Sequence, residues 1–300
     1  MAHAPTTRTI AAGVDGSPES LAAADWAARE AGLRTLPLRL VHAWLWQPLD
    51  VPLAQDREAE ERRAQGVLDE AVAELRSRHP EVEVTAEVVS DTPVPALLAA
   101  ADGAEMLVIG SRGHGALVGF LLGSYGQQVI AAATRPVVSV RAPQEAAPKE
   151  AGPAAGGGEI VVGQQGGRDE SAAVLEFAFR TAAARGVGVR AVRAWSLPPL
   201  YAYSPGSLRL ADEAGGLEPY ERKALAEALA PWRERYPDVP VTEHVEIGSG
   251  GQVLLSVAGG AGLMVVGRRV RHAPLGPRIG SVAHAVLHHA PCPVAVVPHE

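Results

Sequence analysis

The chain carries the same local pattern twice, and this duplication constrains its fold more than any other feature. A short apolar run, Met106–Ile109, is followed by a glycine at position 110 and by a loop. A matching run, Leu263–Val266, is followed by Gly267, 157 residues further on, and by a second loop. Both loops end at a Gly-Ser pair that opens a helical pattern, at Gly123–Ser124 and at Gly280–Ser281. Self-similarity over such a distance indicates two copies of one folding unit.

The two halves also match outside these loops. The segment Arg76–Thr85 corresponds to Arg233–Thr242 at the same offset of 157 residues. In each half, apolar runs alternate with helical patterns, which predicts parallel strands with helices on both faces of a sheet. We therefore expect an α/β fold of two tandem, open, parallel, five-stranded, doubly wound, Rossmann-like domains. The predicted ranges are 1–143 for the first domain, 144–158 for a linker rich in Pro, Ala and Gly, and 159–300 for the second domain.

Composition narrows the class of protein. The 300 residues carry a net charge of −7, which disfavours a general nucleic-acid surface. The single cysteine, Cys292, excludes a disulfide framework and a four-cysteine metal site, and we expect it to be a buried apolar residue and not a nucleophile. No apolar run approaches the roughly 20 residues of a membrane span, and the first residues lack a signal-peptide pattern. We expect a cytoplasmic protein without membrane or nucleic-acid contacts.

The first glycine loop has the residue types of an anion-binding site. Gly110 is followed after two residues by Gly113, and nine further residues lead to Gly123 and Ser124. Glycines allow positive φ angles and close approach of backbone amides to a phosphate. Ser124 is the predicted N-cap of the next helix, whose positive dipole end would face the same space. The alternative is a surface loop whose glycines only form turns.

With these residues in hand, the chain resembles the universal stress protein domain. The resemblance rests on Gly13–Ser17, on Val41–Ala43, on the spacing of the first glycine loop, and on the ending Gly280–Val294. It covers both halves, apart from the linker and the loops after the second strands. The loop spacing resembles that of the ATP-binding subclass of the family. The resemblance thus implies a fold of the adenine nucleotide α-hydrolase-like kind and ATP, with or without Mg²⁺, as the ligand.

Carried over to the first half, the resemblance assigns a role to each motif residue. It places Asp15 beside the ribose and adenine, and the backbone of Ala43 at the adenine edge. Gly13 stands where a side chain would crowd the nucleotide. His114 would reach a phosphate or else lie in solvent. The residues implied around the phosphates are Gly110, Arg112, Gly113, His114, Gly123, Ser124 and Tyr125.

The second half departs from this pattern at two positions. Its implied nucleotide-binding residues are Gly163, Ala194, Gly267, Arg268, Gly280, Ser281 and Val282. Val270 replaces the second loop glycine, and a β-branched residue resists positive φ. Gln165 replaces the aspartate and brings no charge. The loop also holds four arginines, at positions 268, 269, 271 and 278, which either bind phosphates or form a solvated basic surface. We expect this site to bind ATP more weakly, or with a steeper salt dependence, than the first.

These features favour a nucleotide-binding regulatory protein of the stress response without efficient catalysis. The alternatives are a slow ATPase or a nucleotide-dependent transferase on the same fold, and a scaffold whose loops bind nothing. His284 and His288 are one helical turn apart and could bind a metal ion as a pair, with His289 beside them. We set this possibility aside because no third ligand is apparent. Family relatives pair through their last strands. We therefore expect Pro136–Val140 and Pro293–Val297 to pair as an intrachain pseudo-dimer, with a homodimer and a regulatory protein partner of unidentified class.

Overall fold

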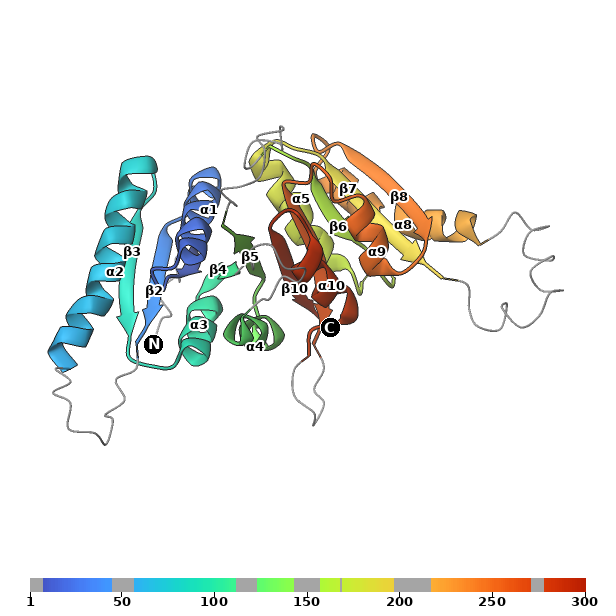
Figure 1. Ribbon diagram of the computed structural model, residues 1–300. Coiled ribbons are helices and arrows are strands. Elements are labelled where there is room, and N and C mark those ends of the chain that lie inside the picture. Colours follow the sequence, from blue (N-terminus) through green and yellow to red (C-terminus); the bar gives the residue numbers. More distant parts are fainter. Residues whose placement is uncertain are drawn as a thin grey trace, which may run out of the picture. The chain divides into compact units, whose positions relative to one another are not determined.

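The computed structural model describes residues 8–44, 57–111, 123–142, 157–167, 169–196, 217–270 and 278–300. The chain forms two compact units, unit 1 with strands β1 to β5 and unit 2 with strands β6 to β10 (Figure 1). Strands and helices alternate in both units, so the predicted α/β class is confirmed. Residues 143–156, which include most of the predicted linker at 144–158, lie outside the described residues.

Unit 1 has its five strands in a parallel sheet of order β3-β2-β1-β4-β5. Helices α1 and α2 pack against each other on the sheet, and α3 packs on α4. Its elements are β1 (Thr9–Gly13), α1 (Pro18–Arg34), β2 (Leu38–Ala43), α2 (Arg57–Arg78), β3 (Val84–Val89), α3 (Pro93–Asp102), β4 (Ala104–Ser111), α4 (Ser124–Ala132) and β5 (Val137–Arg141).

Unit 2 repeats this topology, with strand order β10-β9-β6-β7-β8 and parallel pairing throughout. Helix α5 packs on α8, and α9 packs on α10. Its elements are β6 (Ile160–Gly163), α5 (Ala172–Arg185), β7 (Val189–Trp195), α8 (Glu218–Arg235), β8 (Val241–Ile247), α9 (Gly250–Ser256), β9 (Leu263–Arg269), α10 (Ser281–His289) and β10 (Val294–His299).

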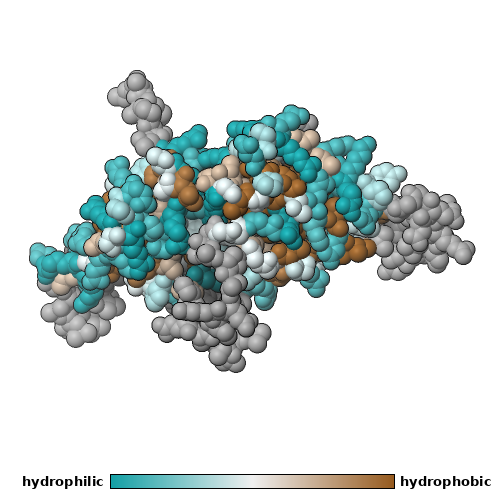
Figure 2. All heavy atoms as spheres, turned by 90° about the horizontal axis from the view of Figure 1, so that it is seen from above, coloured by the Kyte–Doolittle hydropathy of each residue, from teal (hydrophilic) through white to brown (hydrophobic). Residues whose placement is uncertain are grey.

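The core consists of the central strands and the helix faces that cover them. Met106–Ile109 in β4 and Leu263–Val266 in β9 are all buried, as expected of parallel strands covered on both faces. In α2, Ala64, Leu68, Ala71 and Leu75 recur at helical spacing and are buried, whereas Val72 is half-buried. On the face shown in Figure 2, hydrophilic side chains surround smaller apolar patches.

Helix α1 has a defined cap at each end. Ser17 is the N-cap, its hydroxyl accepts a hydrogen bond from the Ser20 amide at 3.3 Å, and Pro18 follows at the first helical position. The helix extends to Arg34 and closes on Thr35 with a left-handed φ of 53°. The cap fixes where α1 begins above the carboxyl end of the sheet.

A charged cluster joins α1 to the end of α2. The Asp25 carboxylate on α1 lies 3.0 Å from His79 Nε2 and 3.5 Å from Arg78 Nη1, and it also pairs with Arg29. Burial by itself would raise the pKa of Asp25, but the hydrogen bond with His79 and the charge of Arg29 outweigh it and hold the pKa below 3.8. The cluster therefore stabilises the fold only while Asp25 is ionised.

We predict that Asp25→Asn lowers the free energy of unfolding by about 1–2 kcal/mol at pH 7. A depressed folded-state pKa adds stability that is present above the unfolded pKa, about 3.9, and is lost as the pH falls through the lower folded value. The gap between wild type and variant should therefore close on acidification. Urea unfolding at pH 7 and pH 3 measures it. Glu61→Gln on the exposed face of α2 is the control, and a gap that does not narrow between pH 7 and pH 3 would contradict the account.

Candidate functional site

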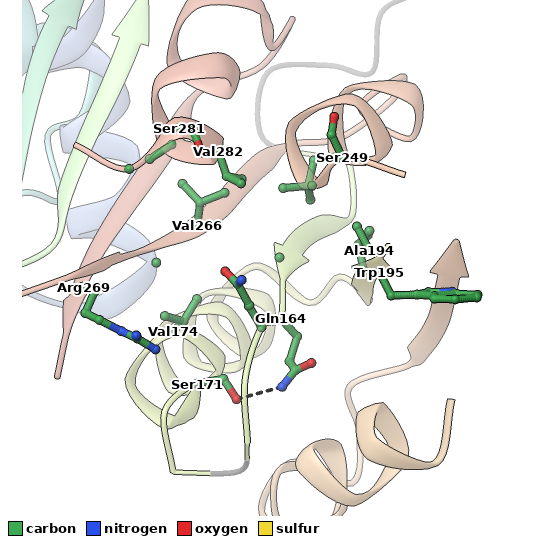
Figure 3. Close-up of a pocket in the computed structure, with 18 of the residues that line it drawn as sticks. Gln164, Ser171, Val174, Ala194, Trp195, Ser249, Val266, Arg269, Ser281 and Val282 are labelled. Atoms are coloured by element: carbon green, nitrogen blue, oxygen red, sulfur yellow. Dashed lines mark hydrogen bonds between the residues drawn. The ribbon is translucent and has the colours of Figure 1, made fainter. Parts of the chain in front are cut away.

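Unit 2 contains a cavity of about 590 Å³ at the carboxyl ends of β6, β7 and β9 (Figure 3). One wall comes from the turn before α5 and the start of that helix, with Glu170, Ser171 and Val174. The opposite wall comes from α9 and from the first residues of α10, including Ser281 and Val282. In open parallel sheets, ligands bind at this edge. The cavity volume lies within the range of roughly 300–1,000 Å³ found for small-molecule sites.

Most residues predicted for the second half line this cavity. They come from four separate stretches of the chain, which the parallel topology brings to one edge. These lining residues are Gly163, Ala194, Gly267, Gly280, Ser281 and Val282. Gln165, which replaces the aspartate of the first half, lines the cavity as well.

Arg268 is the exception, because successive side chains of a strand point to opposite faces. Its side chain is only 4% exposed, and it is not among the lining residues. Burial lowers the pKa of its guanidinium group. The neighbouring Arg269 lines the cavity instead, and its Nη2 lies 2.6 Å from Glu170 Oε2.

The glycines at the strand ends serve close packing and not positive φ. Among the described residues, neither Gly110 nor Gly267 has a positive φ. A Cβ on Gly110 would lie 2.6 Å from the Glu19 carbonyl carbon in α1, and a Cβ on Gly267 would lie 2.7 Å from His299 Nε2. Gly13 is similar, since a Cβ there would lie 2.7 Å from the Leu97 side chain. In this structure the missing side chains make room for neighbouring elements.

Val270 does not resist the local backbone as the sequence suggested. Thr35 is the one described non-glycine residue with positive φ, so Val270 adopts an ordinary conformation. Its amide donates to the His299 carbonyl at 2.7 Å and extends the pairing of β9 with β10. The expectation of strain at this position is therefore wrong. The remaining loop residues at 271–277, including Arg271, lie outside the described residues, and Arg278 is exposed.

The prediction that Ser124 is the N-cap of α4 is also wrong, and α10 begins in the same way as α4. The N-caps of α4 and α10 are Gly123 and Gly280, which have extended ψ angles of 153° and 159°. Their carbonyls accept the first helical bonds, from Gln127 at 3.1 Å and from His284 at 2.9 Å. Ser124 and Ser281 are thus the first helical residues. Neither glycine cap has a side chain that bonds to the first amides of its helix, and helix N-termini of this kind are suited to binding an anion.

A polar network beneath the cavity could not be foreseen from the repeat. Gln164 is buried, and its Nε2 donates to Ser171 Oγ at 3.2 Å. Its Oε1 accepts from Arg193 Nη1 at 2.6 Å, and Arg193 Nε donates to Glu221 on α8 at 2.6 Å. Val14 and His42 occupy the matching positions of unit 1, where His42 Nδ1 lies 2.7 Å from the Val14 carbonyl oxygen. The one sequence signal for this network was Gln164, a polar residue at the strand end where unit 1 has Val14.

In unit 1 the described site residues lie at the same edge. Asp15 Oδ1 accepts hydrogen bonds from the amide and hydroxyl of Ser17, which places this carboxylate in the turn before α1. Ala43 ends β2, and Tyr125 in the first turn of α4 is exposed. The predicted phosphate residues Arg112, Gly113 and His114 lie outside the described residues.

The histidines of α10 form a contact pair. The ring centroids of His284 and His288 are 4.3 Å apart, and burial, followed by the charges of His288 and His289, lowers the pKa of His284. Within the described ranges, no group of three His, Cys, Asp or Glu side chains is arranged to hold a metal ion. Cys292 is buried, as its apolar setting predicted.

The fold and cavity define a tandem, Rossmann-like α/β protein with a ligand-sized cavity at the carboxyl edge of a parallel sheet. A model described as "Universal stress protein family" matches residues 6–141 and 158–298. The chain belongs to the universal stress protein family, with one domain of that family in each half. In the parts of the chain that the structure describes, no helix is long and apolar enough to cross a membrane.

Two similar proteins match this chain over nearly its whole length, and a third matches about half of it. A universal stress protein of Mycobacterium tuberculosis is 35% identical over 298 residues, which cover 96% of each chain. A crystal structure of a universal stress protein from Archaeoglobus fulgidus covers 98% of this chain and 99% of its own at 16% identity and a TM-score of 0.67. A universal stress protein solved in complex with cAMP is 28% identical and covers 45% of this chain and 98% of its own, with a TM-score of 0.37.

The packing at Gly110 gives a stability prediction that is independent of any ligand. Gly110→Ala should destabilise unit 1 by about 1–3 kcal/mol, because the new methyl group would meet helix backbone that has no rotamer to change. Gly103→Ala is the matched control, since nothing lies within 4 Å of a Cβ there. Thermal unfolding of both variants measures the difference, and equal stabilities would refute the packing role.

Proposed function

We propose that this chain binds an adenine nucleotide at the carboxyl edge of each sheet and acts as a regulatory binding protein without efficient catalysis. The observation that carries the proposal is the unit 2 cavity, which gathers strand ends and the start of a helix around one ligand-sized space. Unit 1 has the same topology and the complete glycine spacing at Gly110, Gly113 and Gly123. ATP, with or without Mg²⁺, is the predicted ligand of unit 1.

The start of α10 supports an anionic ligand in unit 2. Ser281, Val282 and Ala283 are the first three residues of this helix, and all of them line the cavity. Their amides have no partner four residues earlier within the helix, and the helix dipole places positive potential at the same point. A phosphate group satisfies both features at once.

The other walls suit the rest of a nucleotide. Val174, Val266 and Leu254 provide apolar surface, and Ala194 and Trp195 end strand β7 at the rim (Figure 3). Polar side chains reach the cavity from β6, the turn before α5, the start of α9, the ends of β9 and β10, and the start of α10. Apolar walls combined with fixed polar groups are typical of cofactor sites.

Site-resolved photolabelling tests the proposal directly. Irradiation of the full-length protein with 8-azido-AMP, followed by peptide mass spectrometry, should place label on the end of β7, near Ala194 and Trp195. Excess AMP should prevent the labelling. Failure to label either unit at saturating probe would reject nucleotide binding and leave the scaffold alternative. Steady-state phosphate release from ATP separates a binding protein from a slow ATPase or transferase.

A charge placed at the start of α10 should separate ligand binding from stability. Ser281→Glu adds a carboxylate to the first turn, where it stabilises the helix by about 0.3–1 kcal/mol. The same charge repels a phosphate, so nucleotide affinity in unit 2 should fall at least about tenfold. Competition of AMP against the label on unit 2, with thermal unfolding in parallel, measures both effects. Ser281→Gln is the neutral control, and unchanged affinity in the Glu variant would contradict the assignment.

Assembly and regulation complete the proposal. The homodimer, the pairing of the terminal strands, the regulatory protein partner and the domain boundaries at 143 and 159 stay predictions. Sedimentation velocity with and without nucleotide measures the number of chains in the assembly. A monomer under both conditions would contradict the predicted homodimer.

A further inference from the structure

The turn before α5 distinguishes unit 2 from unit 1 at the cavity. Ser20 and Ser171 are equivalent, because their hydroxyls donate to the matching carbonyls of Ser17 and Gly167. Helix α1 begins at Pro18, two residues before its serine, whereas α5 begins at Ala172, one residue after its serine. The helix of unit 2 therefore starts three residues later, and Glu170 lies in the turn that replaces its first residues.

The carboxylate of Glu170 lies beside Gly166 and pairs with Arg269 at the cavity. Gly166 has a φ of 76°, and a Cβ built on it would lie 2.4 Å from Glu170 Oε2. The carboxylate thus occupies the place of a side chain at position 166. The same oxygen lies 2.6 Å from Arg269 Nη2. Glu170 and Arg269 are both about half exposed, so an incoming ligand can reach them.

This ion pair neutralises one of the four arginines that the sequence assigned to the site. Among the described lining residues, the ionisable side chains are Glu170, Arg269 and His299. Arg269 is neutralised by Glu170, and Arg268 faces away in the buried layer. In Figure 3, Arg269 extends toward the side of the cavity formed by Val174 and Ser171, away from Ser281. The start of α10 and the ion pair are therefore separate features of the cavity.

We propose that Glu170 is a specificity-determining residue that makes the unit 2 cavity prefer adenine nucleotides with one phosphate over ATP. The proposal rests on nucleotide binding in this cavity and adds the charge class of the ligand. One phosphate can be held by the amides at the start of α10, and Glu170 is the one carboxylate among the described lining residues. A triphosphate carries further negative charge that must either approach Glu170 or displace it from Arg269. If the phosphates displace Glu170 from Arg269, the Glu170 carboxylate and the phosphates are left side by side with like charge.

Competition for the unit 2 photolabel tests this selectivity in the full-length protein. AMP and ATP, both without Mg²⁺, compete with 8-azido-AMP, and the label on the β7 peptide is measured for each. In wild type, AMP should compete at lower concentration than ATP. Glu170→Gln should shift the ratio of the two midpoints toward ATP by about fivefold, the effect of one partly screened charge. Arg269→Gln should shift it in the opposite direction.

Glu176→Gln is the matched control, because Glu176 lies on α5, pairs with Arg235 at 3.7 Å and does not line the cavity. Its midpoint ratio should equal that of wild type, and thermal unfolding should show that all variants fold. An unchanged ratio in Glu170→Gln, with normal labelling, would overturn the role of Glu170 while leaving nucleotide binding intact. Absence of any label on unit 2 would overturn both proposals.

Discussion

Glycine at the ends of the central strands β4 and β9 lets neighbouring elements pack closely against the sheet. At Gly110 the backbone of α1 lies where a Cβ would be, and at Gly267 the ring of His299 takes that place. A larger residue at position 110 would push α1 away from the carboxyl edge, and one at position 267 would have to displace the His299 ring. The shape of that edge, and with it any ligand site, follows from this close approach.

The same topology therefore yields two different edges. In unit 1 the capped helix α1 reaches forward over Gly110. In unit 2 the corresponding turn stays open, and it holds Glu170 against Gly166 and Arg269. Below it, Gln164 and Arg193 replace the apolar strand end with a hydrogen-bonded network tied to α8. A difference of a few residues in one turn thus changes where the helix begins at this edge without changing the fold.

Sequence patterns predicted parallel sheets and the alternation of strands and helices. They also predicted that residues at the strand ends lie close together, because parallel strands place their carboxyl ends at one edge. They misplaced the cap of α4, since Gly123 with its extended backbone takes that place and Ser124 becomes the first helical residue. They chose Arg268 over Arg269, because strand alternation can only be read once the phase of β9 is known. The pair between Glu170 and Arg269 joins residues 99 positions apart, which no local pattern reports. The loop at 112–122 stays a sequence prediction.

The central claim is that the first turn of α10 binds the phosphate of an adenine nucleotide. Hydrogen–deuterium exchange at the amides of Val282 and Ala283 tests it most directly, because these groups have no partner within the helix. Saturating AMP should slow their exchange by at least about tenfold while amides at the exposed end of α8 stay unchanged. Unchanged exchange at α10, in protein shown by calorimetry to have bound AMP, would contradict the account.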